Sequence, residues 1–186
     1  MILSLIQSNC SAINSVYIYH DFLHDKSYLD LLKNKLQQHI EVAELSHQTN
    51  VKAKMTKWEK LLEDPDFEFL HTQIINTIYN TLSLRNPCTN ERFNFQYTNS
   101  WGMCHEEGDE TLDHIHDFRV WSGAFYIDVP YETKMWFEDF QDYAKILTNT
   151  LVFFQGGTKH RVEKHIGKEK RYSMAFNVLI QNTGLD

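Results

Sequence analysis

The sequence has few cysteines, and their spacing matches no disulfide or zinc pattern. Cys10, Cys88 and Cys104 are an odd number, and none of them belongs to a CxxC pair. A disulfide framework needs paired cysteines and a zinc ribbon needs closely spaced ones, so neither is indicated. Because free thiols persist in a reducing compartment, we expect a cytoplasmic protein.

The sequence also lacks long apolar runs and an excess of basic residues. No stretch approaches the roughly 18 apolar residues of a membrane span. The opening MILSLIQSNCSAINSVY has neither a basic leader nor an apolar core of signal-peptide length. Acidic residues outnumber basic ones by 25 to 18, which gives a net charge of −7 and is typical of a soluble protein. We therefore expect no membrane association and no broad nucleic-acid surface.

What the sequence does contain, in its first half, is helical periodicity. At 186 residues, 42% hydrophobic and 13% aromatic, the chain suits one domain with a sizeable core. Leucine and isoleucine at helical spacing predict a helix over residues 26–40. A second helix is predicted to begin at Asp64-Pro65, which supply a cap and a first-turn proline, and to end before Asn86-Pro87. Three shorter elements complete this half: a strand over 15–23, a loop over 41–54 and a short helix over 56–62.

The second half has the alternating pattern of strands. Phe93, Phe95 and Tyr97 alternate with polar residues, as they do in a half-buried strand. Several short strands separated by turns indicate an antiparallel sandwich or barrel, and helices that precede them are expected to cover one outer face. The predicted strands are 93–97, 100–105, a segment from 114 or 120 to 129, 135–137, 150–154 and 172–180.

Three of the ten histidines are arranged as metal ligands often are. His114 and His116 lie in DHIHDF, and in an extended segment residues i and i+2 project to one face and form a bidentate clamp. The apolar run LVFF leads into a Gly-Gly turn and then His160, and the glycines allow the sharp turn that brings this imidazole to a metal. Arg171 begins the last predicted strand, and its planar guanidinium suits a carboxylate.

These segments together resemble a known family. HIHDFRVWSGAFYIDVP, followed by LVFFQGGTKHRV and RYSMAFNVL, is similar to the 2-oxoglutarate/Fe(II) oxygenase superfamily. The resemblance is to a small branch found in bacteria and tailed phages and related to prolyl 4-hydroxylase-like proteins. YIYHDFLHDKSYLDLLKNKL is similar to the entry strand and helix of those proteins. The strong motifs cover residues 101–180.

The resemblance implies the fold and the domain organisation. We expect an α+β protein built on a double-stranded β-helix, or jelly roll, with N-terminal helices packed on one sheet. Residues 1–186 would form a single oxygenase domain. Within it, residues 1–90 would give mainly helical support and residues 91–182 the jelly-roll core with the metal site.

The resemblance also implies the metal ligands. Iron(II) would be bound by His114 and His160, with His116 at the position where the family carries a carboxylate. Three neutral imidazoles would leave the metal with one more positive charge than the usual two-histidine, one-carboxylate set. Asp113 or Asp117 could supply a carboxylate instead, if a bulge or a strand end turns it toward the metal.

The co-substrate residues follow from the same motifs. Arg171 would pair with the distal carboxylate of 2-oxoglutarate, and Ser173 is the companion hydroxyl of the RxS motif. Tyr126 and Ser122 match positions that hydrogen-bond the same carboxylate.

The implied function is that of a 2-oxoglutarate- and Fe(II)-dependent dioxygenase, an oxidoreductase of the hydroxylase type in a bacterial or phage-infected cell. It would use a small-molecule co-substrate and act on an unidentified protein side chain or small metabolite. One alternative is a cupin-like three-histidine iron dioxygenase that does not use 2-oxoglutarate. Another is a non-catalytic phage or assembly β-sandwich, and the sequence leaves a homodimer open.

Overall fold

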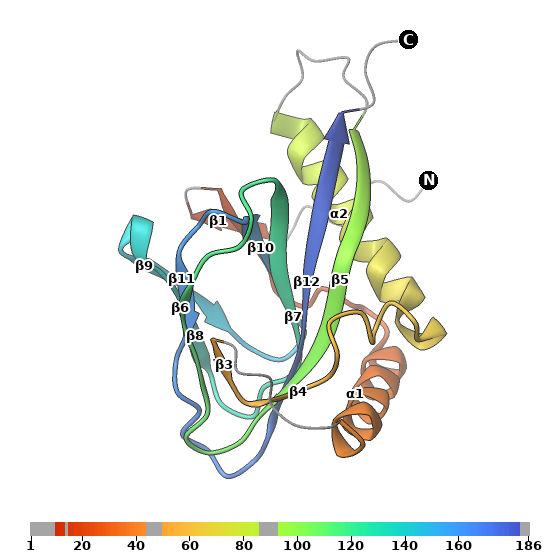
Figure 1. The fold of residues 1–186 in the computed structure, drawn as a ribbon, viewed down its shortest axis with the longest axis vertical. Helices are drawn as coiled ribbons and strands as arrows, with labels where there is room; N and C mark the ends of the chain where they lie inside the picture. Colours follow the sequence, from red (N-terminus) through yellow and green to blue (C-terminus); the bar gives the residue numbers. More distant parts are fainter. Residues whose placement is uncertain (1–9, 14, 44–49, 86–92, 183–186) are drawn as a thin grey trace.

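Two antiparallel sheets that face each other form the frame of the computed structural model, which describes residues 10–13, 15–43, 50–85 and 93–182 (Figure 1). The larger sheet has the strand order β1-β2-β10-β7-β12-β5-β4, and the smaller has the order β3-β6-β11-β8-β9. The strands are β1 (Cys10–Ile13), β2 (Val16–Tyr19), β3 (Val51–Lys52), β4 (Lys54–Met55), β5 (Phe93–His105), β6 (Glu110–His114), β7 (Val120–Asp128), β8 (Thr133–Phe137), β9 (Asp142–Ile146), β10 (Thr150–Gln155), β11 (His160–Val162) and β12 (Arg171–Asn182).

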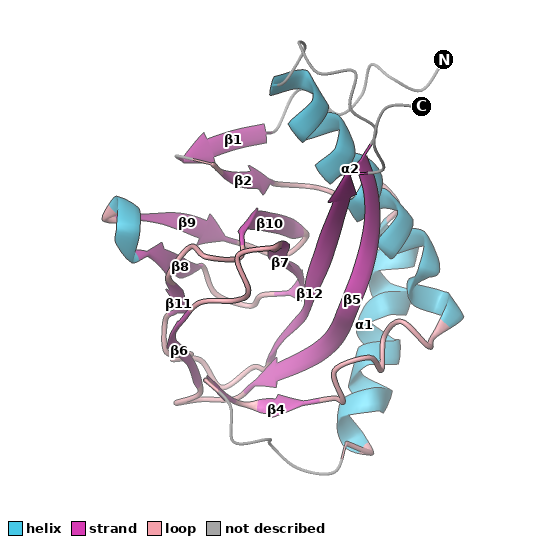
Figure 2. Cartoon of the chain, turned by 45° about the horizontal axis from the view of Figure 1, so that its top comes forward, coloured by secondary structure: helices cyan, strands magenta, loops and turns pink. Residues whose placement is uncertain are grey.

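Two helices cover the outer face of the larger sheet, behind the long pair β5 and β12 (Figure 2). They are α1 (Lys26–Glu41) and α2 (Glu68–Arg85), the latter preceded by the 3-10 turn η1 (Pro65–Phe67); a second such turn, η2 (Glu138–Phe140), follows β8. The α1 helix is capped by Asp25, whose side chain accepts hydrogen bonds from the backbone of Ser27 and Tyr28. Asp64 caps η1 as the sequence predicted. Both predicted helices are confirmed. Within the described residues, no helix combines the length and the hydrophobicity of a membrane-spanning segment.

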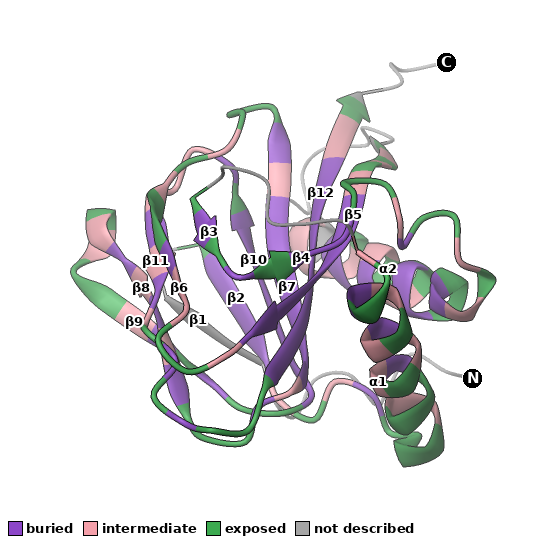
Figure 3. Ribbon diagram, turned by 60° about the horizontal axis from the view of Figure 1, so that its bottom comes forward, coloured by how far each residue is buried: buried purple, intermediate pink, exposed green. Residues whose placement is uncertain are grey.

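The larger sheet divides the interior into two apolar layers, because alternate residues of each strand point to opposite faces. On β7, Phe125 and Ile127 pack with the helices, whereas Ala124 and Tyr126 pack with residues of the smaller sheet. The strands β7, β10 and β12 are buried along most of their length (Figure 3). The predicted α+β arrangement, with helices on one sheet, is confirmed.

Some local predictions were wrong. Residues 56–62 form no helix, and 58–62 are turns, because Thr56 N and Leu61 N donate to the β5 carbonyls of Gly102 and Ser100. The segment 41–54 was expected to be a loop, but it contributes β3 and the start of β4 to the two sheet edges. Its strands are two residues long, too short to show a period in the sequence.

Candidate metal centre

Three histidine side chains meet where β6 ends and β11 begins. His114 ends β6 and His160 begins β11, and the two residues are partners in the pairing of these strands. The rings of His114 and His160 lie 4.2 Å apart between centroids, and His116 completes the group at 4.9 Å and 5.2 Å from them. One ring nitrogen from each lies within 4.8 Å of the others. In the described part of the chain, this is the one group of three or more His, Cys, Asp or Glu side chains that could hold a metal ion.

Backbone carbonyls orient two of these imidazoles. His114 Nδ1 lies 2.7 Å from the carbonyl oxygen of Leu112, and His160 Nδ1 lies 2.9 Å from that of Thr158. A carbonyl oxygen only accepts, so each Nδ1 carries the proton and each Nε2 keeps a free lone pair. A hydrogen bond of this kind on the distal nitrogen is usual for histidines that bind metals.

Burial keeps the three imidazoles in the neutral form that binds a metal. It lowers the pKa of His116 to about 4, and the neighbouring His114 adds to this shift. Burial also lowers the pKa of His114, and it holds that of His160 well below its usual range. At neutral pH the cluster is therefore uncharged and ready for a cation.

The Gly-Gly turn holds the segment that carries His116. The backbone N–H of His116 donates to the carbonyl of Gly156 at 2.7 Å, and Gly156 N donates to the carbonyl of Val120. A Cβ at Gly156 would lie 2.2 Å from the carbonyl oxygen of Asp117, and one at Gly157 would lie 2.2 Å from the ring of Phe118. Both glycines lie in the predicted turn. Their lack of a side chain is required because this turn packs closely against the segment that contains Asp117 and Phe118.

The two neighbouring aspartates do not join the cluster. Asp117 accepts from the guanidinium and the backbone of Arg119 and faces solvent. Asp113 lies 3.8 Å from the guanidinium of Arg161, and both side chains are exposed. His116 itself lies beyond the end of β6, in the irregular segment before β7. A strand end is present next to the cluster, as considered for Asp113 and Asp117, but the residue that it directs inward is His116.

Arg171 lies in the interior on β12 and is fully buried. Its Nη1 donates to the hydroxyl of Thr133 at 3.2 Å, while Nε and Nη2 have no hydrogen-bond partner. Burial lowers the pKa of Arg171, yet a guanidinium stays protonated at neutral pH. A buried cation with two unused donors is costly unless an anion binds it, so this side chain fits a carboxylate ligand.

The other predicted co-substrate residues lie on the same inner face but not all beside Arg171. Ser173 and Tyr126 are register partners on β12 and β7, and both are buried. Burial raises the pKa of Tyr126 to about 12, so its hydroxyl remains a donor. These two residues occupy the row next to Arg171.

Ser122 is separated from this row. It donates to Asn177 Oδ1 at 2.6 Å, and Asn177 Nδ2 donates to Asn99 Oδ1 at 2.8 Å. Four residues along a strand correspond to about 13 Å, so Ser122 lies well away from Tyr126. Ser122 bonds within an amide network, and its role in carboxylate binding stays a prediction.

Two hollows meet at the histidines. A narrow internal cavity of about 40 Å³ lies between the sheets, and its walls include the three histidines, Tyr126 and Met135. It holds only a few water molecules, so a larger ligand requires flexible side chains such as Met135 to swing aside. An open groove of about 380 Å³ reaches His114 and His116 from outside. Its lining includes two aromatic residues, one acid and three amides: Trp58, Trp101, Glu59, Asn50, Asn99 and Asn177.

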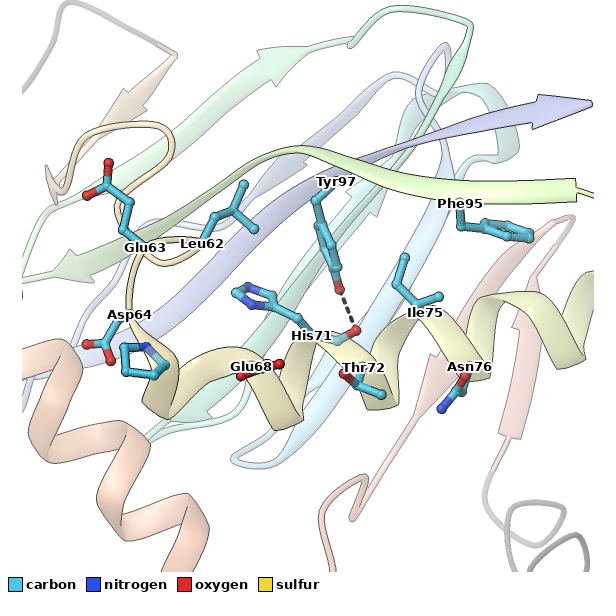
Figure 4. A pocket seen from close by; sticks show the side chains of 11 residues that line it. Leu62, Glu63, Asp64, Glu68, His71, Thr72, Ile75, Asn76, Phe95 and Tyr97 are labelled. Atoms are coloured by element: carbon cyan, nitrogen blue, oxygen red, sulfur yellow. Dashed lines mark hydrogen bonds between the residues drawn. The ribbon is translucent and has the colours of Figure 1, made fainter.

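A wider pocket of about 480 Å³ lies elsewhere, between α2, the loop before it and β5 (Figure 4). Its walls include His71, Phe95 and Tyr97, and the Tyr97 hydroxyl donates to the backbone carbonyl of His71 at 3.0 Å. No residue of the histidine cluster lines it. The sequence predicted no site there, and its size alone does not indicate one.

No protein-family model matches the sequence, and no curated protein matches it. The structure is nevertheless similar to solved structures. A viral collagen prolyl hydroxylase from Paramecium Bursaria Chlorella virus-1, in complex with 2OG, aligns with a TM-score of 0.62 and 14% identity over 88% of this chain and 95% of that one. A Pseudomonas putida prolyl-4-hydroxylase aligns with a TM-score of 0.64 and 14% identity over 91% of this chain and 94% of that one.

A third similar structure is SnoN, a non-heme alpha ketoglutarate dependent epimerase from nogalamycin biosynthesis. It aligns with a TM-score of 0.69 and 11% identity over 89% of this chain and 77% of that one. At such identities a likeness shows the fold. The chain therefore has the fold of the 2-oxoglutarate/Fe(II) oxygenases, which confirms the predicted double-stranded β-helix.

Proposed function

We propose that this protein is a 2-oxoglutarate- and Fe(II)-dependent dioxygenase that hydroxylates its substrate beside His114, His116 and His160. The observation that carries the proposal is Arg171, a buried guanidinium with two unpartnered donors on the larger sheet, which faces the smaller sheet that carries the histidine pair. A metal-binding cluster on one sheet and an anion-binding arginine on the other suit a co-substrate that chelates a metal and carries a second carboxylate. Two of the similar structures are prolyl hydroxylases, one of them in complex with 2OG.

The residues present fit both groups. Nε2 of His114 and of His160, with one ring nitrogen of His116, would hold the metal, which imidazole ligands suit. Arg171 would bind the distal carboxylate through Nε and Nη2, with Ser173 and Tyr126 in the adjacent row. Iron(II) and 2-oxoglutarate, when bound, would supply the oxidising chemistry, in which one atom of dioxygen oxidises the co-substrate to succinate and carbon dioxide and the other enters the substrate.

The chain's own part is to bind, orient and exclude water. Phe154 packs against the His160 ring at 4.4 Å between centroids, and both residues line the internal cavity. Small residues on the facing strands, Ala124 and Ala175, leave the space opposite the histidines. The open groove, which His114 and His116 line, would bring the substrate to the metal. Both a protein side chain and a small metabolite fit such an approach.

The test is anaerobic addition of iron(II) and then 2-oxoglutarate to the purified protein. We expect the weak visible charge-transfer band of a chelated co-substrate. The Arg171→Ala variant should need much more 2-oxoglutarate to give the same band, because the buried carboxylate loses its charged partner. No band in either protein would rule the proposal out.

A second candidate is a three-histidine iron dioxygenase that does not use 2-oxoglutarate, which the all-imidazole ligand set favours. It predicts iron(II) binding without the 2-oxoglutarate band, and an Arg171→Ala variant that behaves like the wild type. A protein that binds no iron(II) at all, and that His114→Ala leaves unchanged, would instead be a non-catalytic β-sandwich.

A further inference from the structure

His105 is a buried histidine that stands directly beside Arg171. The two residues are register partners on the neighbouring strands β5 and β12, so their side chains lie on the same face of the larger sheet. His105 is 2% exposed. Its Nε2 lies 3.2 Å from the hydroxyl of Thr111 on β6, while its Nδ1 has no partner.

Unpartnered buried nitrogens are concentrated at this pair. Within the described residues, four buried side-chain nitrogen or oxygen atoms have no hydrogen-bond partner. They are Nε and Nη2 of Arg171, Nδ1 of His105 and Nε1 of Trp101. Buried polar groups in folded proteins are nearly always paired, so unpaired atoms gathered in one place indicate a ligand that pairs with them.

We propose that His105 is a second residue of the co-substrate site, whose Nδ1–H donates to the same carboxylate that Arg171 binds through Nε and Nη2. This inference rests on the proposed function and names a residue that the sequence motifs do not include. Thr111 would set the tautomer, because its hydroxyl can donate to Nε2 and leave the ring proton on Nδ1.

The surroundings favour an anion at this place. Burial, together with the charge of Arg171, keeps the pKa of His105 well below its usual range, so the ring is neutral and presents one N–H. Asp109 lies close enough to raise the pKa of Arg171, but its Oδ2 accepts from the backbone of Glu106 at 2.8 Å. A carboxylate that only accepts hydrogen bonds matches all three unused nitrogens.

The test compares two keto acids on nickel-loaded protein by calorimetry. 2-Oxoglutarate and 2-oxopentanoate share the chelating end, but 2-oxopentanoate lacks the distal carboxylate. We expect His105→Phe to weaken 2-oxoglutarate binding about 10-fold to 100-fold, the effect of a hydrogen bond to a charged group. Binding of 2-oxopentanoate and of nickel should stay as in the wild type, and His105→Gln, which keeps a donor, should recover part of the loss.

The matched control is His71→Phe, which replaces a buried histidine on the helical side of the sheet and should leave the ratio of the two affinities unchanged. Thr111→Val offers a second test that leaves His105 unchanged. Without the hydroxyl the ring proton of His105 is no longer held on Nδ1, so binding of 2-oxoglutarate, but not of 2-oxopentanoate, should weaken by several-fold.

Two results would overturn the inference about His105: equal weakening of both keto acids, or an unchanged preference for 2-oxoglutarate in His105→Phe and Thr111→Val. A wild-type protein that binds nickel but shows no preference for 2-oxoglutarate would overturn the proposed function as well. The two failures are therefore distinguishable.

Discussion

His114 and His160 face each other across the β6–β11 pair, with their ring centroids 4.2 Å apart, and each ring is fixed by a backbone carbonyl. The two ligands that sequence analysis supported most strongly thus come from adjacent strands of one sheet. His116 reaches the same point from a loop, and its position depends on contacts outside that sheet. The position of His116 can therefore be disturbed through its loop contacts, whereas the positions of His114 and His160 depend on the β6–β11 pair.

Removal of either strand histidine should abolish tight metal binding. We expect His114→Ala and His160→Ala to weaken nickel or iron(II) binding by more than about 100-fold, because loss of a residue that only orients a ligand already costs about 10-fold to 100-fold. Calorimetry would measure the affinity, and circular dichroism would check the fold. Asp117→Ala is the matched control, since its carboxylate faces Arg119; an equal loss in this variant would contradict the three-histidine site.

Replacement of His116 by aspartate should keep the metal and change its charge. His116→Asp restores a carboxylate, so the nickel-loaded protein should bind azide about 10-fold more weakly than the wild type, since charge neutralisation weakens attraction of a second anion. Titration of the nickel absorption band with azide measures this. Equal azide affinity in both proteins would show that His116 is not a ligand.

Gly156→Ala should displace His116 without a change at the other ligands. The added Cβ would lie 2.2 Å from the carbonyl oxygen of Asp117, so the segment that carries His116 must shift. We expect nickel affinity to fall at least about 10-fold, as it does when ligand orientation is lost.

Gly108→Ala is the control for this change. Gly108 has a φ of +92°, and a Cβ there would meet nothing within 4 Å. An alanine at this position should cost about 1 kcal/mol of stability, through backbone strain, and should leave nickel binding intact. Gly156→Ala with unchanged nickel affinity would contradict the account of the turn.

His71 should make the protein less stable in mild acid. Burial lowers its pKa to about 4, and its Nε2 forms a hydrogen bond with the hydroxyl of Ser100. As the pH falls below about 6.5, the unfolded chain takes up a proton that the folded chain refuses until about pH 4. The free energy of unfolding therefore falls by about 3 kcal/mol as the pH drops through this window. Above about pH 6.5 the contribution of neutral His71 is fully present.

Chemical denaturation of the wild type and His71→Phe between pH 4 and 7 would measure this contribution. The difference in unfolding free energy between the two proteins should shrink or reverse in the variant's favour as the pH falls. A difference that stays constant with pH would exclude a buried neutral His71.

Periodicity was enough to predict the two helices and most of the long strands. Leu32, Leu36 and Ile40 are buried at the predicted spacing, and Asp64 caps where the sequence placed it. The prediction of a helix over residues 56–62 was wrong: Trp58 and Leu62 have helical spacing, but the backbone of this segment forms hydrogen bonds with β5. Contacts of this kind depend on a distant strand and leave no period in the local sequence.

For the site, the ligand types could be predicted but their environments could not. His116 was expected on a strand with His114, yet it lies past the strand end and turns inward through the Gly156 loop. Ser122 shares a face with Tyr126, but strand rise separates the two, and only the register shows Asn177 as its partner. The position of His105 in the sequence pattern places it near the pocket, but its unpaired nitrogen is a property of the packed interior that the sequence does not show.

The histidines belong to the smaller sheet and its following loop, whereas Arg171 and His105 belong to the larger one. A molecule that contacts both groups joins two sheets that otherwise meet through apolar side chains and hydrogen bonds such as those of Arg171 with Thr133 and of His105 with Thr111. Occupancy would then resist separation of the layers, so ligand and metal should raise the melting temperature more together than the sum of their separate effects. In that sense the co-substrate would be a component of the folded interior as well as a reactant.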